Sequence, residues 1–530
     1  MKSIVNATET ITIPKAEYES LNRQISWLTE QLRRSNQRQF GASSEKSVVI
    51  DGEQLSIFNE AESAACFAAA EPTLEQVAAH TRKKAKGKRE LDFSGLPVEQ
   101  IVHELPESER ICPDCGGPTH ACGHEVYRRE LTVIPAQFKV TEHVQTVYSC
   151  RHCEATSDES VPMLKSDVPA PTIKGSGVAS PSLLAYIAHQ KYVLALPLYR
   201  QEQEFNRLGL NLSRQTMANW MIYVSTKYLQ PIYDTLYAKL LKNQIMHADE
   251  TVVQVLNEPG KTAQSKSYMW LYRTSGDAVN AIVLYQYQPD RKYHRPADFL
   301  DDWSGYLHTD GYQGYHELKN VISVGCWAHM RRKFTDILKT LPEKARSGSE
   351  AMRGKAFCDR LFKLEREFSG LPPDKRLKAR LEQSKPVMDA FFDWVDHSGA
   401  LPQTGIGKAI GYAKSERIYL ENVLLDGRLE LSNNRAERSV KPFVLGRKNW
   451  IFSDSVNGAK ASATLYSIIE TAKENGLHPF DYLEFVFSEA PNLDTRNDSD
   501  ALEKLLPWNA PHGCRRAEKT VNALLPWDEN

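Results

Sequence analysis

The sequence predicts a multidomain α/β protein, and three observations lead to that class. The chain has 530 residues, of which 41% are hydrophobic and 25% charged, so it is long enough for several domains of ordinary composition. Strand-like runs gather between residues 243 and 326, and a helical pattern far longer than an ordinary connection follows from 327 to 425. Two CxxC pairs precede both regions. We therefore expect a mixed-sheet core with a helical insertion, preceded by smaller modules.

Charge and hydropathy exclude some classes of protein. The formal net charge is −1, so any binding to nucleic acid would depend on local basic clusters and not on a global field. No run of about 18 apolar residues occurs, and residues 1–15 lack the apolar core of a signal peptide. A cytoplasmic protein without a membrane span is expected.

Residues 1–41 predict a coiled-coil helix. An apolar seam recurs there every three or four residues, at Tyr18, Leu21, Ile25, Leu28 and Leu32. Such a seam could pack on its own protein. A dimer is favoured, because no other apolar core lies nearby in the sequence.

Residues 42–95 predict a basic linker that is partly disordered, because the apolar periodicity fades into Ser, Glu, Ala and Lys. Its RKKAKGKR run, residues 82–89, is either a solvated tail or a non-specific contact for DNA phosphates. The sequence favours neither interpretation.

Residues 96–165 predict a zinc-binding module. Two CxxC pairs frame a strand-like stretch, and their four thiolates can complete one tetrahedral Zn²⁺ site that excludes water. Such a site is structural and not catalytic. The four candidate ligands are Cys112, Cys115, Cys150 and Cys153.

Residues 170–242 predict a helical DNA-binding domain of the helix-turn-helix type. One helix should end near Leu208, Gly209 should turn the chain, and Ser213 should cap a second helix over residues 214–224. A helical hairpin without a DNA-binding role fits this segment equally well. In the DNA-binding interpretation, Arg214, Gln215 and Asn219 would face a major groove.

Two acids stand in matching strand contexts within residues 243–326. Asp249 lies in QIMHADETVVQVL, and Asp310 lies in SGYLHTDGYQGYHEL. A histidine precedes each acid by two residues, so each His shares a strand face with its Asp. An acid in a strand is costly unless it is paired, and a divalent metal is a usual partner. We expect His247 and His308 to be buried hydrogen-bonding residues and not ligands.

A third acid lies in the next segment, residues 426–460. Ser432, Asn433 and Asn434 are good helix N-cap residues, so Glu437 should fall in the first turns of a helix. Lys441 follows one turn later on the same face. Arg447 and Lys448 come further along and are candidates for contact with DNA.

Four segments resemble those of a known family. They begin at His247, His308, Cys326 and Asn433, and they read HADET, HTDGY, CWAHMRRKF and NNRAERSVKPFVLGRKNWIF. They resemble the transposase of the insertion-sequence-66 family, a DDE transposase family with an RNase H-like catalytic domain. The resemblance extends from about residue 15 to about residue 490. The zinc module and the helical start of the chain also match segments of that family.

The resemblance implies that Asp249, Asp310 and Glu437 form a metal-binding catalytic triad. They would hold two Mg²⁺ (or Mn²⁺) ions and support cleavage at the ends of a DNA element and joining of those ends to target DNA. The implied partners are transposon ends, target DNA, a second copy of the chain and accessory proteins encoded by the same element. Ser432 departs from the family pattern, which usually has an aspartate before the two asparagines.

Two other functions stay open at this stage. One is an RNase H-like nuclease or resolvase that cuts DNA without joining it. The other is a zinc-dependent DNA-binding regulator with an inactive core. The presence of all three acids in matching contexts speaks against the regulator.

The CWAHMRRKF segment raises the question of a second zinc site. Cys326 and His329 have CxxH spacing, and two further ligands would have to come from Cys358 and His397. The favoured interpretation is that Cys326 ends a buried strand and His329 packs beneath the insertion. Arg331 and Arg332 are expected to face substrate phosphate.

The chain ends with a predicted helical segment over residues 461–490 and a polar tail over residues 491–530. The tail contains the sequence LLPW twice, at residues 505–508 and 524–527. The sequence assigns no role to either copy.

The zinc module yields a prediction. A fragment covering residues 95–165 should bind one zinc ion, and Cys112→Ser should unfold that module, because a structural metal supplies much of a small module's folding free energy. In the full chain the same substitution should weaken DNA binding. Metal analysis of the fragment checks the first expectation, and a fragment without stoichiometric zinc would refute the site.

Overall fold

The computed structural model of the chain describes residues 106, 117, 138–149, 163–493 and 498–515. The apolar seam of residues 18–32, the basic run of residues 82–89 and the four CxxC cysteines lie outside the described residues. The chain divides into two compact units, one of residues 42–168 and one of residues 1–41 with 169–530. In the first unit, β1 (Val147–Ser149) pairs in antiparallel fashion with β2 (Met163–Lys165).

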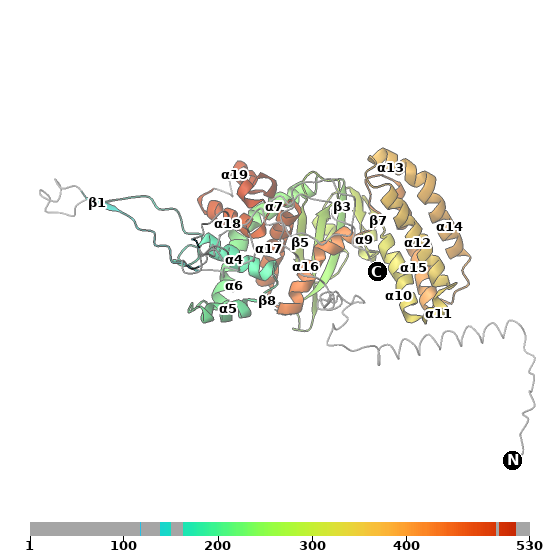
Figure 1. The fold of residues 1–530 in the computed structure, drawn as a ribbon, viewed down its shortest axis with the longest axis horizontal. Coiled ribbons are helices and arrows are strands. Elements are labelled where there is room, and N and C mark those ends of the chain that lie inside the picture. Colours follow the sequence, from blue (N-terminus) through green and yellow to red (C-terminus); the bar gives the residue numbers. More distant parts are fainter. Residues whose placement is uncertain (1–105, 107–116, 118–137, 150–162, 494–497, 516–530) are drawn as a thin grey trace, which may run out of the picture. The chain divides into compact units, whose positions relative to one another are not determined.

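A mixed sheet forms the centre of the second unit (Figure 1). Its strand order is β5-β4-β3-β6-β7; β3, β4 and β5 pair in antiparallel fashion, whereas β6 and β7 continue in parallel from β3. The strands lie where the apolar runs predict them. Their bounds are β3 (Ile245–Asn257), β4 (Lys266–Thr274), β5 (Val283–Gln288), β6 (Gly305–His308) and β7 (Val321–Val324). A short strand, β8 (Ser453–Ser455), pairs in parallel with the far end of β3.

The register between β3 and β6 is set by their apolar residues. Ile245 and Met246 pair with Tyr306 and Leu307, and His247 lies opposite His308. Met246 and Leu307 lie on one face of the sheet and the two histidines on the other, and all four are fully buried. A shift by one residue would bring a histidine of one strand beside an apolar residue of the other. After the paired histidines β6 ends, whereas β3 continues to Asn257.

Helix α17 (Val456–Glu474) covers the outer edge of the sheet. The hydroxyl of Ser467 accepts a hydrogen bond from the Tyr285 N–H at 2.7 Å, and the hydroxyl of Thr471 accepts one from the Val283 N–H at 3.0 Å. An edge strand otherwise leaves such groups unpaired. Two hydroxyls at i and i+4 of one helix therefore close the β5 edge.

The helices before the sheet match the predicted helix-turn-helix pattern. Helix α5 ends at Arg207, Gly209 takes a positive φ of 78°, and the Ser213 hydroxyl accepts a bond from the Thr216 N–H at the start of the next helix. The elements of this block are α4 (Pro181–Tyr192), α5 (Leu198–Arg207), α6 (Arg214–Val224), the π-helical turn η2 (Ser225–Leu229) and α7 (Gln230–Leu240). The block shares one hydrophobic core with the sheet and α17.

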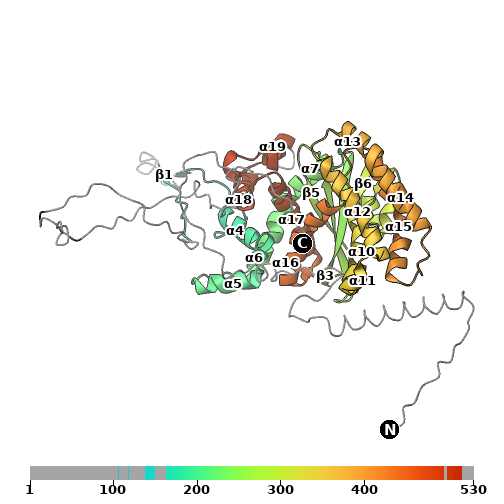
Figure 2. The same cartoon turned by 45° about the vertical axis from the view of Figure 1, so that its right-hand side comes forward.

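The helices of the insertion after β7 lie beside that strand (Figures 1 and 2). They enclose a second hydrophobic core. Buried aromatic residues from two of its helices fill the core, among them Trp327, Phe334, Phe391 and Trp394. Its elements are α10 (Trp327–Thr340), α11 (Glu343–Arg346), α12 (Glu350–Glu367), α13 (Pro373–Ala379), η3 (Arg380–Ser384), α14 (Lys385–Asp396), α15 (Gly405–Glu421) and η4 (Asn422–Leu424).

Buried Arg380 anchors the end of the insertion. Its guanidinium pairs with Glu365 and donates to the carbonyls of Val423, Asp426 and Leu429. These carbonyls belong to the segment that returns the chain to α16 (Asn434–Trp450), which lies across β3. Two short helices, α8 (His294–Leu300) and α9 (Gln313–His316), flank β6.

The described part of the segment after residue 490 is packed and not a free tail. Leu505 and Leu506, from the first LLPW copy, are fully buried, and the Tyr482 hydroxyl donates to the Leu505 carbonyl at 2.7 Å. The second copy lies outside the described residues. The elements here are α18 (Pro479–Glu489), η5 (Ala490–Asn492), α19 (Ser499–Leu505), η6 (Pro507–Asn509) and η7 (His512–Cys514).

Within the part of the chain that the structure describes, no helix combines the length and the apolarity needed to cross a membrane.

The edge contact of α17 yields a prediction. Thr471→Val keeps the shape of the side chain but leaves the buried Val283 N–H without its partner, which should lower the free energy of unfolding by about 1–3 kcal/mol. Urea denaturation measures the change. The matched control is Thr226→Val, since Thr226 is exposed and its hydroxyl bonds only within its own helix. Equal stabilities of the two variants would contradict the role given to Thr471.

Candidate active site

Asp249 and Asp310 follow the paired histidines of two neighbouring strands. His247 lies opposite His308 in the parallel pairing of β3 with β6, and each acid comes two residues later. Both acids are half-buried. The Asp310 carboxylate accepts a hydrogen bond from the Tyr312 N–H at 3.1 Å, which holds it at the turn after β6. Asp249 therefore lies on the central strand β3 and Asp310 just beyond the last residue of β6, close enough for their charges to interact.

Glu437, on α16, lies near these two acids. The helix begins at Asn434 and packs against β3, which places Glu437 in its first turn near the acids. Burial raises the pKa of Asp249 well above its usual value, and the negative charges of Glu250, Asp310 and Glu437 raise it further. The charges of the other two predicted acids therefore act on Asp249. We call Asp249, Asp310 and Glu437 the acid cluster, and a metal site shared by all three stays a prediction.

This cluster has the chemistry of a divalent-cation site. Several carboxylates in a partly buried place repel one another, and a cation between them relieves both the repulsion and the loss of hydration. Oxygen donors are the ligands that Mg²⁺ and Mn²⁺ prefer. The residues present therefore fit the metals that the resemblance implies.

The two histidines are buried and hydrogen-bonded, as the sequence predicts, and their partners lie in the segment before α16. Their rings are fully buried and stacked, with centroids 4.3 Å apart. Nδ1 of His247 bonds Oδ1 of Asn433 at 2.9 Å, and the Glu430 N–H donates to Nε2 of His308 at 3.2 Å. Burial lowers the pKa of His247 to about 3 and that of His308 well below its usual value, so both rings are neutral. They connect β3 and β6 to the segment that leads into α16.

Asn433 has a different role from the one expected of a helix cap. It occupies the N-cap position of α16, but its amide oxygen faces His247 and its amide nitrogen donates to the Ala248 carbonyl at 2.8 Å. The side chain therefore attaches the start of α16 to β3 next to Asp249. The preference of asparagine for N-cap positions correctly predicted the start of the helix. It did not predict the contact of Asn433 with β3.

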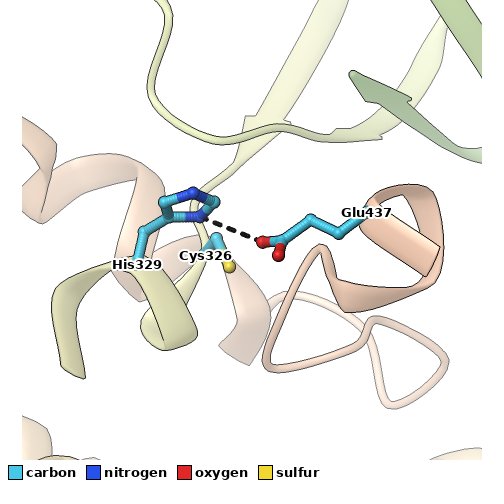
Figure 3. A group of neighbouring side chains, drawn as sticks. All are labelled: Cys326, His329 and Glu437. Atoms are coloured by element: carbon cyan, nitrogen blue, oxygen red, sulfur yellow. Dashed lines mark ion pairs between the residues drawn. The ribbon is translucent and has the colours of Figure 1, made fainter. Parts of the chain in front are cut away.

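Glu437 is held by residues of α10. One carboxylate oxygen lies 3.0 Å from Arg332 Nη2, and the other lies 3.5 Å from His329 Nδ1. Figure 3 shows the His329 and Glu437 side chains pointing toward each other, with the Cys326 sulfur beside them. The ligand atoms of these three residues lie within 4.8 Å of one another.

The surroundings of Cys326 favour a thiol over a zinc ligand. The residue is buried directly after β7, and its sulfur accepts a hydrogen bond from the Asn433 N–H at 3.1 Å. Burial raises the pKa of the thiol to about 12, whereas a zinc ligand has to be a thiolate. Of the two further ligands considered, Cys358 is buried in the core of the insertion, and His397 is exposed beside Asp393. Neither residue completes a zinc site with Cys326 and His329, and one zinc ion per chain stays a prediction.

Arg331 and Arg332 face carboxylates in this structure. Arg331 Nε lies 2.6 Å from the Asp359 carboxylate, and Arg332 pairs with Glu437. Their contact with DNA phosphate stays a prediction. It would require both guanidinium groups to leave the carboxylates of Asp359 and Glu437.

The other candidate DNA contacts lie on two helices. Arg214, Gln215 and Asn219 are exposed on α6. On α16, Lys441 and Lys448 are exposed, and Arg447 Nη1 lies 3.4 Å from the Thr251 hydroxyl, two residues beyond Asp249 on β3. Basic side chains thus extend along α16 away from the acid cluster.

Two further acids interact with Asp310 through their charges and were not predicted from the sequence. Glu250 follows Asp249 on the strand and therefore points to the other face, where it pairs with Arg291 and accepts a bond from the Tyr315 hydroxyl at 2.5 Å. Burial and the charge of Asp310 raise its pKa to about 7. The second acid is Glu416, on α15 of the insertion. Alternation along the strand could have revealed Glu250, but nothing in the helical pattern distinguishes Glu416.

Comparisons with known proteins support the same interpretation. The family model described as "Transposase IS66 family" matches residues 176–461. Models described as "zinc-finger binding domain of transposase IS66", "IS66 C-terminal element" and "Transposase C of IS166 homeodomain" match residues 109–154, 467–508 and 27–101. The zinc-finger match spans all four CxxC cysteines, and the C-terminal match includes the first LLPW copy.

Relatives from Sinorhizobium fredii resemble nearly the whole chain. "Uncharacterized protein y4qI" is 30% identical over 514 residues, which cover 93% of this chain and 91% of the relative. "Uncharacterized protein y4jD" is 31% identical over 512 residues, which cover 93% of this chain and 96% of the relative.

The contacts of Asn433 yield a prediction. Asn433→Ala leaves His247 and the Ala248 carbonyl without their partner inside the protein, so the free energy of unfolding should fall by about 1–3 kcal/mol. Denaturant titration of both variants checks this, with Asn434→Ala at the adjacent, half-buried position as the control. If both substitutions had the same small effect, Asn433 would not hold α16 to β3.

Proposed function

Because the chain belongs to the IS66 family of transposases, we propose that it binds the ends of a DNA element, cleaves them and joins them to target DNA. Asp249, Asp310 and Glu437 would form the active site. The observation that carries the proposal is the β3–β6 register. Asp249 and Asp310 each follow a histidine of the His247–His308 pair by two residues, and the charges of Asp310 and Glu437 act on Asp249.

The fold supports the proposed chemistry. The mixed sheet carries one acid on its central strand β3 and a second just after the neighbouring parallel strand β6, and a helix lying across β3 carries the third. This arrangement agrees with the RNase H-like core that the resemblance implies. Bound Mg²⁺ or Mn²⁺ would supply Lewis acidity that activates a water or a 3′-hydroxyl and stabilises the leaving oxygen. The chain's own contribution is to hold the three carboxylates on separate elements around one place.

The contacts of Glu437 suggest how the site changes when it is loaded. In the structure, the Arg332 guanidinium pairs with this carboxylate, and the His329 ring lies 3.5 Å from it. A cation between the acids would compete with Arg332 for Glu437. The released guanidinium would then be available to a DNA phosphate, which suits its bidentate donor geometry.

Three regions are proposed to bind DNA. The zinc module would contribute backbone contacts, α6 would place Arg214, Gln215 and Asn219 in a major groove, and the basic residues of α16 would guide the strand toward the acids. The N-terminal helix would pair two copies of the chain so that two element ends meet. Accessory proteins of the same element are further proposed partners.

One assay separates this function from its alternatives. Purified protein is incubated with labelled element ends, a target plasmid and Mg²⁺. Joined products support the transposase, whereas cut ends without joining would indicate a nuclease or resolvase. A retarded but intact duplex would indicate a DNA-binding regulator.

Single replacement of Asp249, Asp310 or Glu437 by alanine should lower cleavage and joining by about 100-fold or more, because loss of a metal ligand removes several kcal/mol of transition-state stabilisation. Binding of the element ends should be unchanged in an electrophoretic mobility assay, since these residues hold metals and not bases. Exposed Asp302→Ala is the matched control. Near-normal strand transfer by any one of the three variants would remove that residue from the active site.

A further inference from the structure

The helical insertion contacts the acid cluster at the turn that follows Asp310. The hydroxyl of Tyr412, on α15, donates a hydrogen bond to the Asp310 carbonyl at 3.1 Å. Gly311 has a positive φ of 91°, and a Cβ at this position would lie 3.0 Å from both the Tyr412 hydroxyl and a Glu416 oxygen. Helix α15 therefore lies directly against the backbone of the turn, closely enough to restrict its conformation.

Glu416 is buried in this contact although it carries an ionisable group. The residue is 6% exposed, and its Oε2 lies 3.6 Å from Nε2 of His316. Neither atom has a hydrogen-bond partner among the described residues. The His316 ring stacks on Tyr419, at 3.6 Å between centroids. Burial and the charge of Asp310 raise the pKa of Glu416 to about 7, whereas Lys333 opposes that rise. A buried carboxylate oxygen without a hydrogen-bonding partner costs free energy, so the position of Glu416 next to Asp310 needs an explanation.

The position of α15 relative to the sheet is fixed at the end of the helix. The Gly325 N–H donates to the Tyr419 carbonyl at 2.8 Å, and the Trp327 indole donates to the Leu420 carbonyl at 3.0 Å. The Asn422 amide donates to the Ser323 carbonyl at 2.8 Å. These bonds attach α15 to β7 and to the start of α10. Tyr412 and Glu416 are thus held at the Asp310 turn by β7 and by α10, the helix that carries the partners of Glu437.

We propose that Tyr412 and Glu416 are positioning residues through which the helical insertion sets the affinity of the acid cluster for its divalent ion. The Tyr412 hydrogen bond would hold the backbone from which the Asp310 carboxylate projects. The Glu416 carboxylate would add a negative charge beside the ion in a partly buried environment, where charges interact strongly. Residues that orient or support metal ligands commonly change metal affinity by about 10- to 100-fold when they are replaced. The inference rests on the proposed function, because it assumes that the acid cluster binds a divalent ion.

The test is a titration of the zinc-loaded full-length chain with Mn²⁺, followed by electron paramagnetic resonance in mildly alkaline buffer without DNA. Tyr412→Phe removes the hydroxyl and keeps the ring, and Glu416→Gln removes the charge and keeps the shape. Each should weaken binding of Mn²⁺ by about tenfold. Glu416→Asp, which restores the charge, should recover most of the affinity. The control is Glu421→Gln on the same helix, where the carboxylate pairs with Arg417, and this variant should bind Mn²⁺ like the unaltered chain.

The outcomes separate the inference from the proposed function. If the unaltered chain binds Mn²⁺ at a site abolished by Asp249→Ala, and Tyr412→Phe and Glu416→Gln bind it equally well, the inference is wrong and the acid site stands. If Glu416→Gln and Glu416→Asp weaken Mn²⁺ binding equally, with a parallel loss of thermal stability, Glu416 is only structural and the inference is also wrong. If the unaltered chain has no Mn²⁺ site that depends on Asp249, both proposals fail.

Discussion

In the parallel pairing of β3 with β6, His247 lies opposite His308. Asp249 and Asp310 each follow one of these histidines by two residues and therefore lie near each other. Side chains alternate along a strand, so a shift of one residue would turn one carboxylate away from the other. The stacked, buried histidines oppose such a shift, because both rings also bond the segment that leads into α16. One register therefore sets the core packing, the positions of two acids and the entry of the helix that carries the third.

The gathering of carboxylates has an electrostatic cost that the structure balances on both faces of the sheet. On one face Arg291 pairs with Glu250, and on the other Arg332 and His329 hold Glu437. Arg332 and His329 come from α10, the first helix of the insertion, and α15 returns to contact the turn after Asp310. The insertion thus contacts two of the three acids, although it interrupts the sequence between them. A long insertion at this point of the chain is then part of the proposed active site.

Features governed by neighbouring residues could be predicted from the sequence. Apolar alternation located the strands, and Gly209 and Ser213 correctly marked the turn and the start of α6. The repeated spacing of His and Asp correctly indicated buried histidines beside two acids. Contacts between distant segments could not be predicted, because no periodicity records them. Three contacts of this kind join residues that only the folded chain brings together. They are Arg332 with Glu437, Asn433 with β3, and Glu416 with Gly311. The buried first LLPW copy belongs to the same class, since its apolar partners lie on other helices.

The central claim is that acids from β3, from the turn after β6 and from α16 meet around one divalent-ion site. Anomalous diffraction from crystals of the full-length chain soaked in Mn²⁺ tests it most directly. The account predicts anomalous peaks contacted by carboxylate oxygens of Asp249, Asp310 and Glu437 at about 2.0–2.3 Å. It also predicts that Arg332 has moved away from Glu437. Mn²⁺ bound elsewhere, with the Arg332–Glu437 pair intact and the three carboxylates without an ion at saturating Mn²⁺, would contradict it.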